Sequence, residues 1–189
     1  MTILIIGLVL FLGMHSVSIF AEGTRNSVAA KSELGWKAIY GVVSLIGLYL
    51  IIKGYGAARL EPVVLYTPPI WLRHLSALLL LPVFILFFAP YFPGRIKTAT
   101  KHPQLIAVKL WAIAHLLVNG TVADVVLFGS FLAWAVADRI SLKRRTVRAI
   151  PGAPASALND PVLVVLGLGA YVAFAFWAHA AWIGVAPFG

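Results

Sequence analysis

The feature that most constrains this chain is a series of long apolar segments with little sequence between them. Six segments qualify: Thr2–Phe20, Trp36–Gly56, Ile70–Phe88, Gln104–Val118, Val122–Ala137 and Val162–Ile183. A helix needs roughly 20 mostly apolar residues to cross a bilayer, and lipid offers no partner for its backbone polar groups. Hydrophobic residues make up 61% of the 189 residues, so no separate soluble core can form. We therefore expect an all-α polytopic bundle of about six transmembrane helices, organised as one domain over residues 1–189.

The basic residues beside the segments indicate how the helices are oriented. Ten lie on one side of the membrane: Arg25, Lys31, Arg95, Lys97, Lys101, Arg139, Lys143, Arg144, Arg145 and Arg148. Three lie on the other: Lys53, Arg59 and Arg73. The positive-inside rule places the richer side in the cytoplasm, which puts both termini outside it. The first segment has no basic stretch before it, so we expect a retained helix rather than a cleaved signal peptide.

Charge and composition also exclude several function classes. The formal charge of +9 is divided among loops bounded by membrane segments, which favours lipid headgroups as partners over nucleic acid. The chain has no cysteine, which excludes disulfides, thiolate catalysis and iron–sulfur clusters. A phosphate-binding glycine loop, a paired-histidine zinc motif and a carboxylate dyad are all missing.

The residues with the clearest chemical potential are five histidines: His15, His74, His102, His115 and His179. His15 and His115 are the most embedded, roughly 8 Å and 17 Å from the cytoplasmic ends of their segments at the helical rise per residue. A titratable ring in hydrocarbon is costly unless something binds it, and histidine is the commonest metal ligand. Each ring therefore either donates to a carbonyl across helices or ligates a metal or haem.

Helical periodicity separates the polar residues of the fourth segment into two groups. Trp111, His115 and Asn119 share one face, whereas His102 and Lys109 lie near the opposite face. His102 and His115 are thus not expected to bind one metal atom together.

Four other polar residues near segment ends have both a structural and a binding interpretation. His102 precedes Pro103, so it either caps a helix or binds a headgroup. Lys109 either extends back to the membrane surface or contacts a haem propionate. Arg73 and His74 form either an interfacial pair or a propionate clamp.

Three further features concern the geometry, the ends and the packing of the helices. Pro82 should kink the third helix. Asp124 is either a helix-start acid or a proton carrier. A stripe on the second helix favours close helix packing, with a substrate groove as the alternative: Tyr40, Ser44, Gly47, Ile51 and Gly54.

Taken together, short motifs spread over about residues 1–145 resemble the NnrU family of bacterial membrane proteins. They are His15-Ser16, Arg25, Tyr40-x3-Ser44-Leu45, Gly54-Tyr55, Trp71-Leu72-Arg73-His74, His102-Pro103, Trp111 through Leu116, Asn119-Gly120 and Leu127-Phe128-Gly129. The resemblance implies a bacterial inner-membrane location, so the outer side on which the charge pattern places both termini is the periplasm. It also implies a link to nitrite and nitric oxide reduction.

The same family includes the zeta-carotene isomerase of plants and cyanobacteria, a haem b protein that isomerises a polyene double bond. This resemblance implies haem b here, with His15 and His115 as the iron ligands. The isomerase has a cysteine where this chain has Ala112, so a switch from histidine to thiolate ligation is not possible. A weaker similarity, through His102-Pro103, is to membrane methyltransferases of the isoprenylcysteine type.

Three hypotheses follow. The first is a haem b-binding NnrU-type protein that supports nitrogen-oxide or redox metabolism, with a redox partner or an apolar small molecule as ligand. The second is a haem-dependent cis–trans isomerase of a carotenoid or other polyene lipid. The third is a structural or assembly partner in the bilayer without a cofactor.

Overall fold

The computed structural model describes residues 1–188 and is built from helices. Helix accounts for 74% of it, and no strand occurs in the described residues. The nearest approach to a strand pairing there is an isolated antiparallel bridge between Val64 and Thr121. The predicted all-α class is confirmed.

Four helical stretches of the described chain are long and apolar enough to cross a membrane. They are Thr2–Phe20, Glu33–Ala58, Leu72–Tyr91 and Asn159–Ile183. The protein is therefore a helical membrane protein, as predicted. The other two predicted segments also form helices, α7 (Pro103–Val118) and α8 (Val122–Ser141). Helix α7 has only 16 residues, and α8 includes the charged residues Asp124, Asp138 and Arg139.

The helices belong to two compact units, each assembled from two stretches of the chain. The first unit contains Met1–Thr67 and Asn119–Thr146, and the second contains Pro68–Val118 and the segment that follows from Val147. Each unit thus combines helices that are far apart in sequence. The single-domain organisation over the whole chain stays a prediction.

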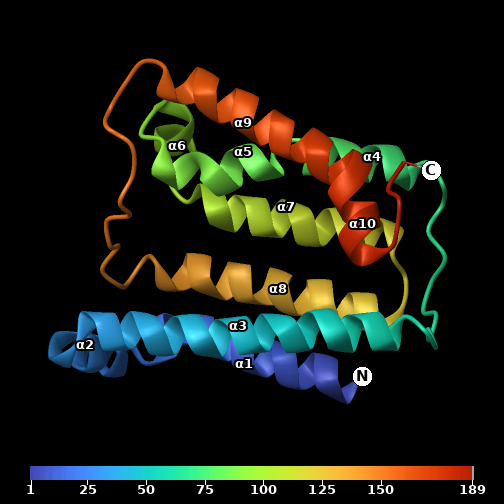
Figure 1. Ribbon diagram of the computed structural model, residues 1–189, viewed down its shortest axis with the longest axis horizontal. Helices are drawn as coiled ribbons and strands as arrows, with labels where there is room; N and C mark the ends of the chain where they lie inside the picture. The colour runs from blue at the N-terminus through green and yellow to red at the C-terminus, as the bar shows by residue number, and fades with distance from the viewer. Residues whose placement is uncertain (189) are drawn as a thin grey trace. The chain divides into compact units, whose positions relative to one another are not determined.

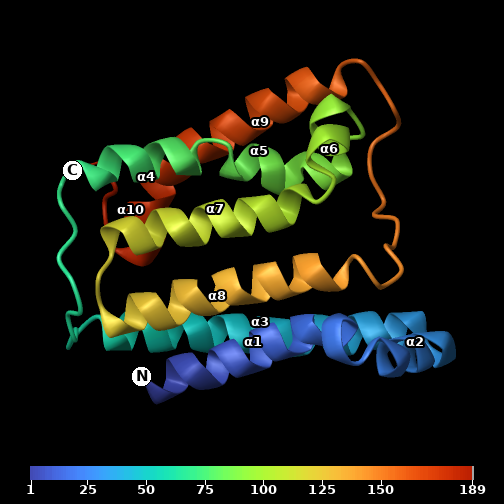
Figure 2. The same ribbon diagram turned by 180° about the vertical axis from the view of Figure 1, so that it is seen from behind.

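In the first unit, α1 (Thr2–Phe20) packs along α3 (Glu33–Ala58), and α8 packs on α1 (Figures 1 and 2). Glycines allow α1 and α3 to approach closely. A Cβ on Gly7 would lie 2.6 Å from the backbone nitrogen of Ile51, and one on Gly47 would lie 2.7 Å from that of Phe11. A Cβ on Gly54 would likewise collide with the backbone of Leu4. The packing stripe predicted on this helix is confirmed at Gly47, Ile51 and Gly54, which are buried.

A short polar helix not predicted from the sequence, α2 (Glu22–Lys31), connects α1 to α3. Ser32 caps α3 by accepting a hydrogen bond from the backbone N–H of Gly35 at 3.0 Å. The segment lacks an apolar stripe and has no buried residue, which is why hydropathy gave no signal for it.

In the second unit, α7 packs against α4 (Leu72–Leu80) and α5 (Val83–Phe88), and α9 (Asn159–Ala173) packs against α5 (Figure 1). The break between α4 and α5 falls at Pro82, as predicted. Gly167 of α9 meets the backbone of Ile85, so α9 and α5 are in close contact.

The rest of the second unit consists of short elements. They are η1 (Ala89–Tyr91), α6 (Arg95–Thr100), a π-helical turn η2 (Phe174–Ala178) and α10 (His179–Ile183). Asp160 at the start of α9 accepts hydrogen bonds from the backbone N–H groups of Arg95 and Ile96, and so caps α6 from another part of the chain. The π turn was not foreseen, because it leaves no mark on the hydropathy pattern.

Candidate functional site: a histidine among aromatic rings

His15 lies in the second half of α1, in the first unit. Its Nδ1 atom is 2.7 Å from the carbonyl oxygen of Phe11, one turn earlier in the helix. A carbonyl can only accept, so Nδ1 carries the hydrogen, and Nε2 of the neutral ring carries the lone pair. Nε2 makes no hydrogen bond to any described residue. Its lone pair is thus available to a ligand.

Aromatic rings from three helices surround the His15 imidazole. Phe11 of α1 stacks on it at 4.2 Å between ring centroids, and Tyr40 of α3 lies at 5.0 Å. Trp134 of α8 meets it edge-on at 5.8 Å. These contacts restrict rotation of the ring and limit the access of water to it. The role of Tyr40 was foreseen only as packing, and that of Trp134 was not foreseen.

Polar groups gather near the same end of α8. Asp138 follows Trp134 by one helical turn and forms a largely buried ion pair with Arg145. The side chains are only 12% and 14% exposed. In the sequence, Arg145 stands out only as one of the ten basic residues on one side of the membrane. An acidic residue at the end of an apolar helix, just before a basic run, was a signal that could have indicated the pair.

Three buried polar atoms in this unit have no hydrogen-bond partner among the described residues. They are Nε1 of Trp134, Nε of Arg145 and Oγ of Ser44. Ser44 follows Tyr40 by one turn of α3, so it lies on the same face as a ring that contacts His15. Buried donors without an acceptor are rare in protein interiors. Here two of them belong to the same unit as His15, whose Nε2 lone pair is also unused.

The opposite end of α8 is fully hydrogen-bonded. Asp124 accepts from the N–H of Thr121 at 2.9 Å and from its hydroxyl at 2.6 Å, and these bonds belong to a capping box. The hydroxyl of Tyr55 donates to the other carboxylate oxygen at 2.5 Å. The prediction that Asp124 is a helix-start acid is confirmed.

The loop before α4 is hydrogen-bonded to the residues just before α8, next to the hydrogen bonds of Asp124. The N–H of Leu65 donates to the carbonyl of Gly120 at 2.7 Å, and the hydroxyl of Tyr66 donates to that of Asn119 at 2.8 Å. A side chain at Gly120 would collide with the carbonyl oxygen of Tyr66. Burial, and then the charge of Asp124, raise the pKa of the Tyr66 hydroxyl above its usual range.

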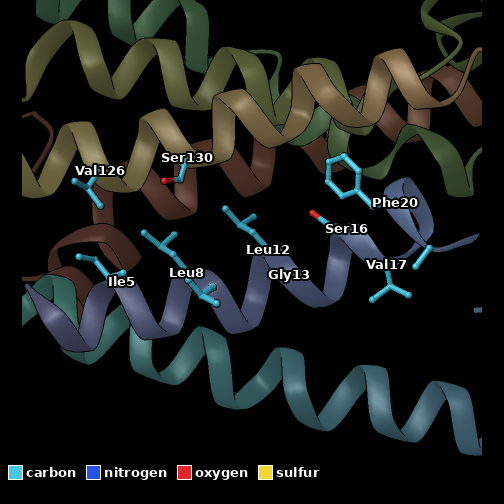
Figure 3. A pocket seen from close by; sticks show the side chains of 11 residues that line it. Ile5, Leu8, Leu12, Gly13, Ser16, Val17, Phe20, Val126 and Ser130 are labelled. Atoms are coloured by element: carbon cyan, nitrogen blue, oxygen red, sulfur yellow. The ribbon is translucent and has the colours of Figure 1, made fainter. Parts of the chain in front are cut away.

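An apolar groove of about 660 Å³ runs along α1 on the side of α8 (Figure 3). Its walls are one face of α1 from Ile5 to Ala21 together with Val126 and Ser130 of α8. Ser16 lines it and directly follows His15, so the groove lies on a face of α1 adjacent to the imidazole.

In the second unit, His115 of α7 makes the same local bond as His15. Its Nδ1 atom is 2.8 Å from the carbonyl oxygen of Trp111, and the two rings lie 5.3 Å apart. The prediction that Trp111 and His115 share a face is confirmed. Nδ1 again carries the hydrogen, which leaves the lone pair on Nε2.

The other candidate residues do not form one cluster in the second unit. Arg73 and His74 are exposed in the first turn of α4, which is antiparallel to α7, so they lie at the same end of the unit as His115 (Figure 1). Lys109 is halfway along α7. His102 is at the far end, where its carbonyl accepts the N–H of Ile106 and α7 begins at the next residue, Pro103. The predicted cap position of His102 is thereby confirmed.

No group of three or more acidic residues, histidines and cysteines within residues 1–188 is arranged to hold a metal ion. His179 is bound within its own terminal turn, with Nδ1 2.6 Å from the carbonyl oxygen of Val185.

Comparison with known proteins places the chain in a family. A search of curated proteins and a search of solved structures each gave no match. The family model described as NnrU protein matches residues 3–187, which is nearly the whole chain and includes the final helix that the sequence motifs left out. The protein belongs to the NnrU family.

Proposed function

We propose that this protein binds haem b in the bacterial inner membrane, with His15 and His115 as iron ligands, and supports nitrite and nitric oxide reduction or related redox metabolism. The observation that carries the proposal is the bond that each ring makes to the carbonyl four residues earlier in its helix. Histidines that ligate metals commonly donate their other N–H to a carbonyl, which sets the tautomer and the ring orientation.

The residues present fit this cofactor. Neutral imidazole is a common axial ligand of haem iron, and Nε2 of His15 carries the lone pair that ligation needs. When bound by two histidines, haem b supplies one-electron transfer. The protein's own contribution is to orient the imidazoles and to surround His15 with Phe11, Tyr40 and Trp134, which exclude water.

The absorption spectrum of the purified protein tests the assignment. His15→Ala and His115→Ala should each remove most of the Soret band, because each deletes a ligand. His179→Ala is the matched control and should leave the band unchanged, since that ring is bound within its own terminal turn. If both single variants retain full haem and an unchanged low-spin spectrum, the assignment is wrong.

A second candidate function is cis–trans isomerisation of a carotenoid or other polyene lipid. The apolar groove beside His15 favours it, since a groove of this composition suits an extended apolar molecule. Ala112 argues against it, because this buried position offers no sulfur ligand where the isomerase has one. Incubating the reduced haem protein with a cis polyene in the dark distinguishes the two. Turnover well above that of a haem-free control would favour the isomerase, and turnover only after Ala112→Cys would favour a ligand switch.

We further propose that all six predicted segments cross the membrane, with both termini in the periplasm. The ten-to-three asymmetry of basic residues supports this orientation. An alkaline phosphatase fusion at the C-terminus should be active, and a fusion near Pro151 should be inactive. The reverse pattern would overturn the topology.

A further inference from the structure

Near Asp138, at the C-terminal end of α8, two buried hydrogen-bond donors have no acceptor among the described residues, and one of them belongs to a cation. The guanidinium of Arg145 is held by Asp138, yet its Nε–H is buried and has no acceptor among the described residues. The indole N–H of Trp134 is in the same condition. Both groups can only donate, so the occupant that they lack is an acceptor.

Each of the two donors belongs to a neighbour of Asp138. Trp134 precedes Asp138 by one turn on the same face of α8, and Arg145 contacts the Asp138 carboxylate directly. The edge contact between the rings of Trp134 and His15 puts this region next to the imidazole. A donor on a buried guanidinium favours an anionic acceptor over a neutral one, because charge-assisted hydrogen bonds are the stronger ones.

We propose that Arg145 and Trp134 form a carboxylate-binding site that holds a propionate of the haem ligated by His15. The inference rests on the proposed haem function and extends it, because the sequence offered Arg73 and His74, or Lys109, only as one of two interpretations for contact with a propionate. Arg145, Trp134 and His15 all belong to the first unit. Arg145 is suited to the role because its Nε–H, on a permanently charged guanidinium, can donate to a carboxylate oxygen while Asp138 holds the same side chain.

The test compares haem b with haem b dimethyl ester, in which both propionates are esterified and uncharged. Full-length protein in detergent is titrated with each compound, and the Soret band reports binding. Wild type should bind haem b more tightly than the ester. Arg145→Gln should weaken haem b binding about tenfold and leave ester binding unchanged, because it removes one charge-assisted contact.

Two further variants separate the site from general effects of charge and folding. Arg144→Gln removes an equal charge from the exposed neighbouring residue and should keep the wild-type preference for haem b. Trp134→Phe keeps the ring against His15 but lacks the N–H, and should weaken haem b binding by a smaller factor than Arg145→Gln does.

The possible results distinguish this site from the haem assignment. A His15-dependent Soret band, with the same ratio of the two affinities in wild type and Arg145→Gln, would overturn the carboxylate site alone. The donors would then hold only water. An equal loss of both affinities in Arg145→Gln would show a structural role and would also overturn the site. If wild type forms no His15-dependent Soret band, the haem assignment and the site both fail.

Discussion

The two ends of α8 use similar residues in different ways. At the N-terminal end, Asp124 receives hydrogen bonds from Thr121 and Tyr55 that occupy both of its oxygens. At the C-terminal end, Asp138 is paired with Arg145, but Nε of that arginine has no acceptor in the described chain. A closed network stabilises the fold. Buried donors without acceptors lower the stability of the fold. Such donors are common in a binding site before its ligand is bound.

The largest expected effect comes from breaking the ion pair at the C-terminal end. Asp138→Ala would leave the Arg145 charge largely buried and unpaired, so we expect a loss of about 3 kcal/mol in the free energy of unfolding. Unfolding in mixed detergent micelles, followed by tryptophan fluorescence, measures it. The double variant Asp138→Leu with Arg145→Met should recover most of the loss, because no unpaired charge remains. A single variant as stable as wild type would show that water reaches the pair.

Disrupting the hydrogen bonds at the Asp124 end of α8 should have a smaller effect on the free energy of unfolding. Asp124→Ala removes the cap of α8 and leaves the Tyr55 hydroxyl without its acceptor, which together should cost about 2 kcal/mol. The preference for haem b over its dimethyl ester should not change. If that preference falls, the two ends of α8 are not independent and the comparison fails.

A more selective change at the closed end is Tyr55→Phe. It removes one hydrogen bond and keeps the ring against Phe128, so we expect a loss of about 1 kcal/mol. Combining it with Asp124→Ala should cost less than the sum of the single changes, because both remove the same bond. Strict additivity, measured by the same unfolding assay, would contradict a direct interaction.

The smallest expected effect is at Ser44. Its buried hydroxyl has no partner among residues 1–188, so Ser44→Ala should change the stability of haem-free protein by at most about 0.5 kcal/mol. Val43→Ala on the same helix serves as a control for side-chain truncation. A loss above about 1 kcal/mol from Ser44→Ala in haem-free protein would reveal an unrecognised partner.

Local sequence accounts for part of the candidate site. The shared face of Trp111 and His115 follows from a four-residue spacing, and the role of Asp124 follows from its place three residues after Thr121. Such pairs lie within one helical turn, so periodicity and capping rules predict them. The bond from His15 to Phe11 has the same spacing and could have been predicted too.

The contacts that distinguish His15 from an ordinary membrane histidine were out of reach of such rules. Tyr40 and Trp134 come from other helices, and Tyr55 and Asp124 are 69 residues apart. Whether these side chains touch depends on how closely the helices pack against one another. In the first unit, the backbone contacts at Gly7, Gly47 and Gly54 set that spacing.

By itself, the sequence determined that the protein is a helical membrane protein of the NnrU family with a histidine inside two of its apolar helices, because lipid requires local backbone pairing and long apolar runs. The tertiary structure alone decided which rings enclose His15, and that among the described residues buried donors remain at one end of α8 and none at the end near Asp124. The physical reason is that hydropathy and periodicity describe one helix at a time. Side-chain partnership between helices is set by packing.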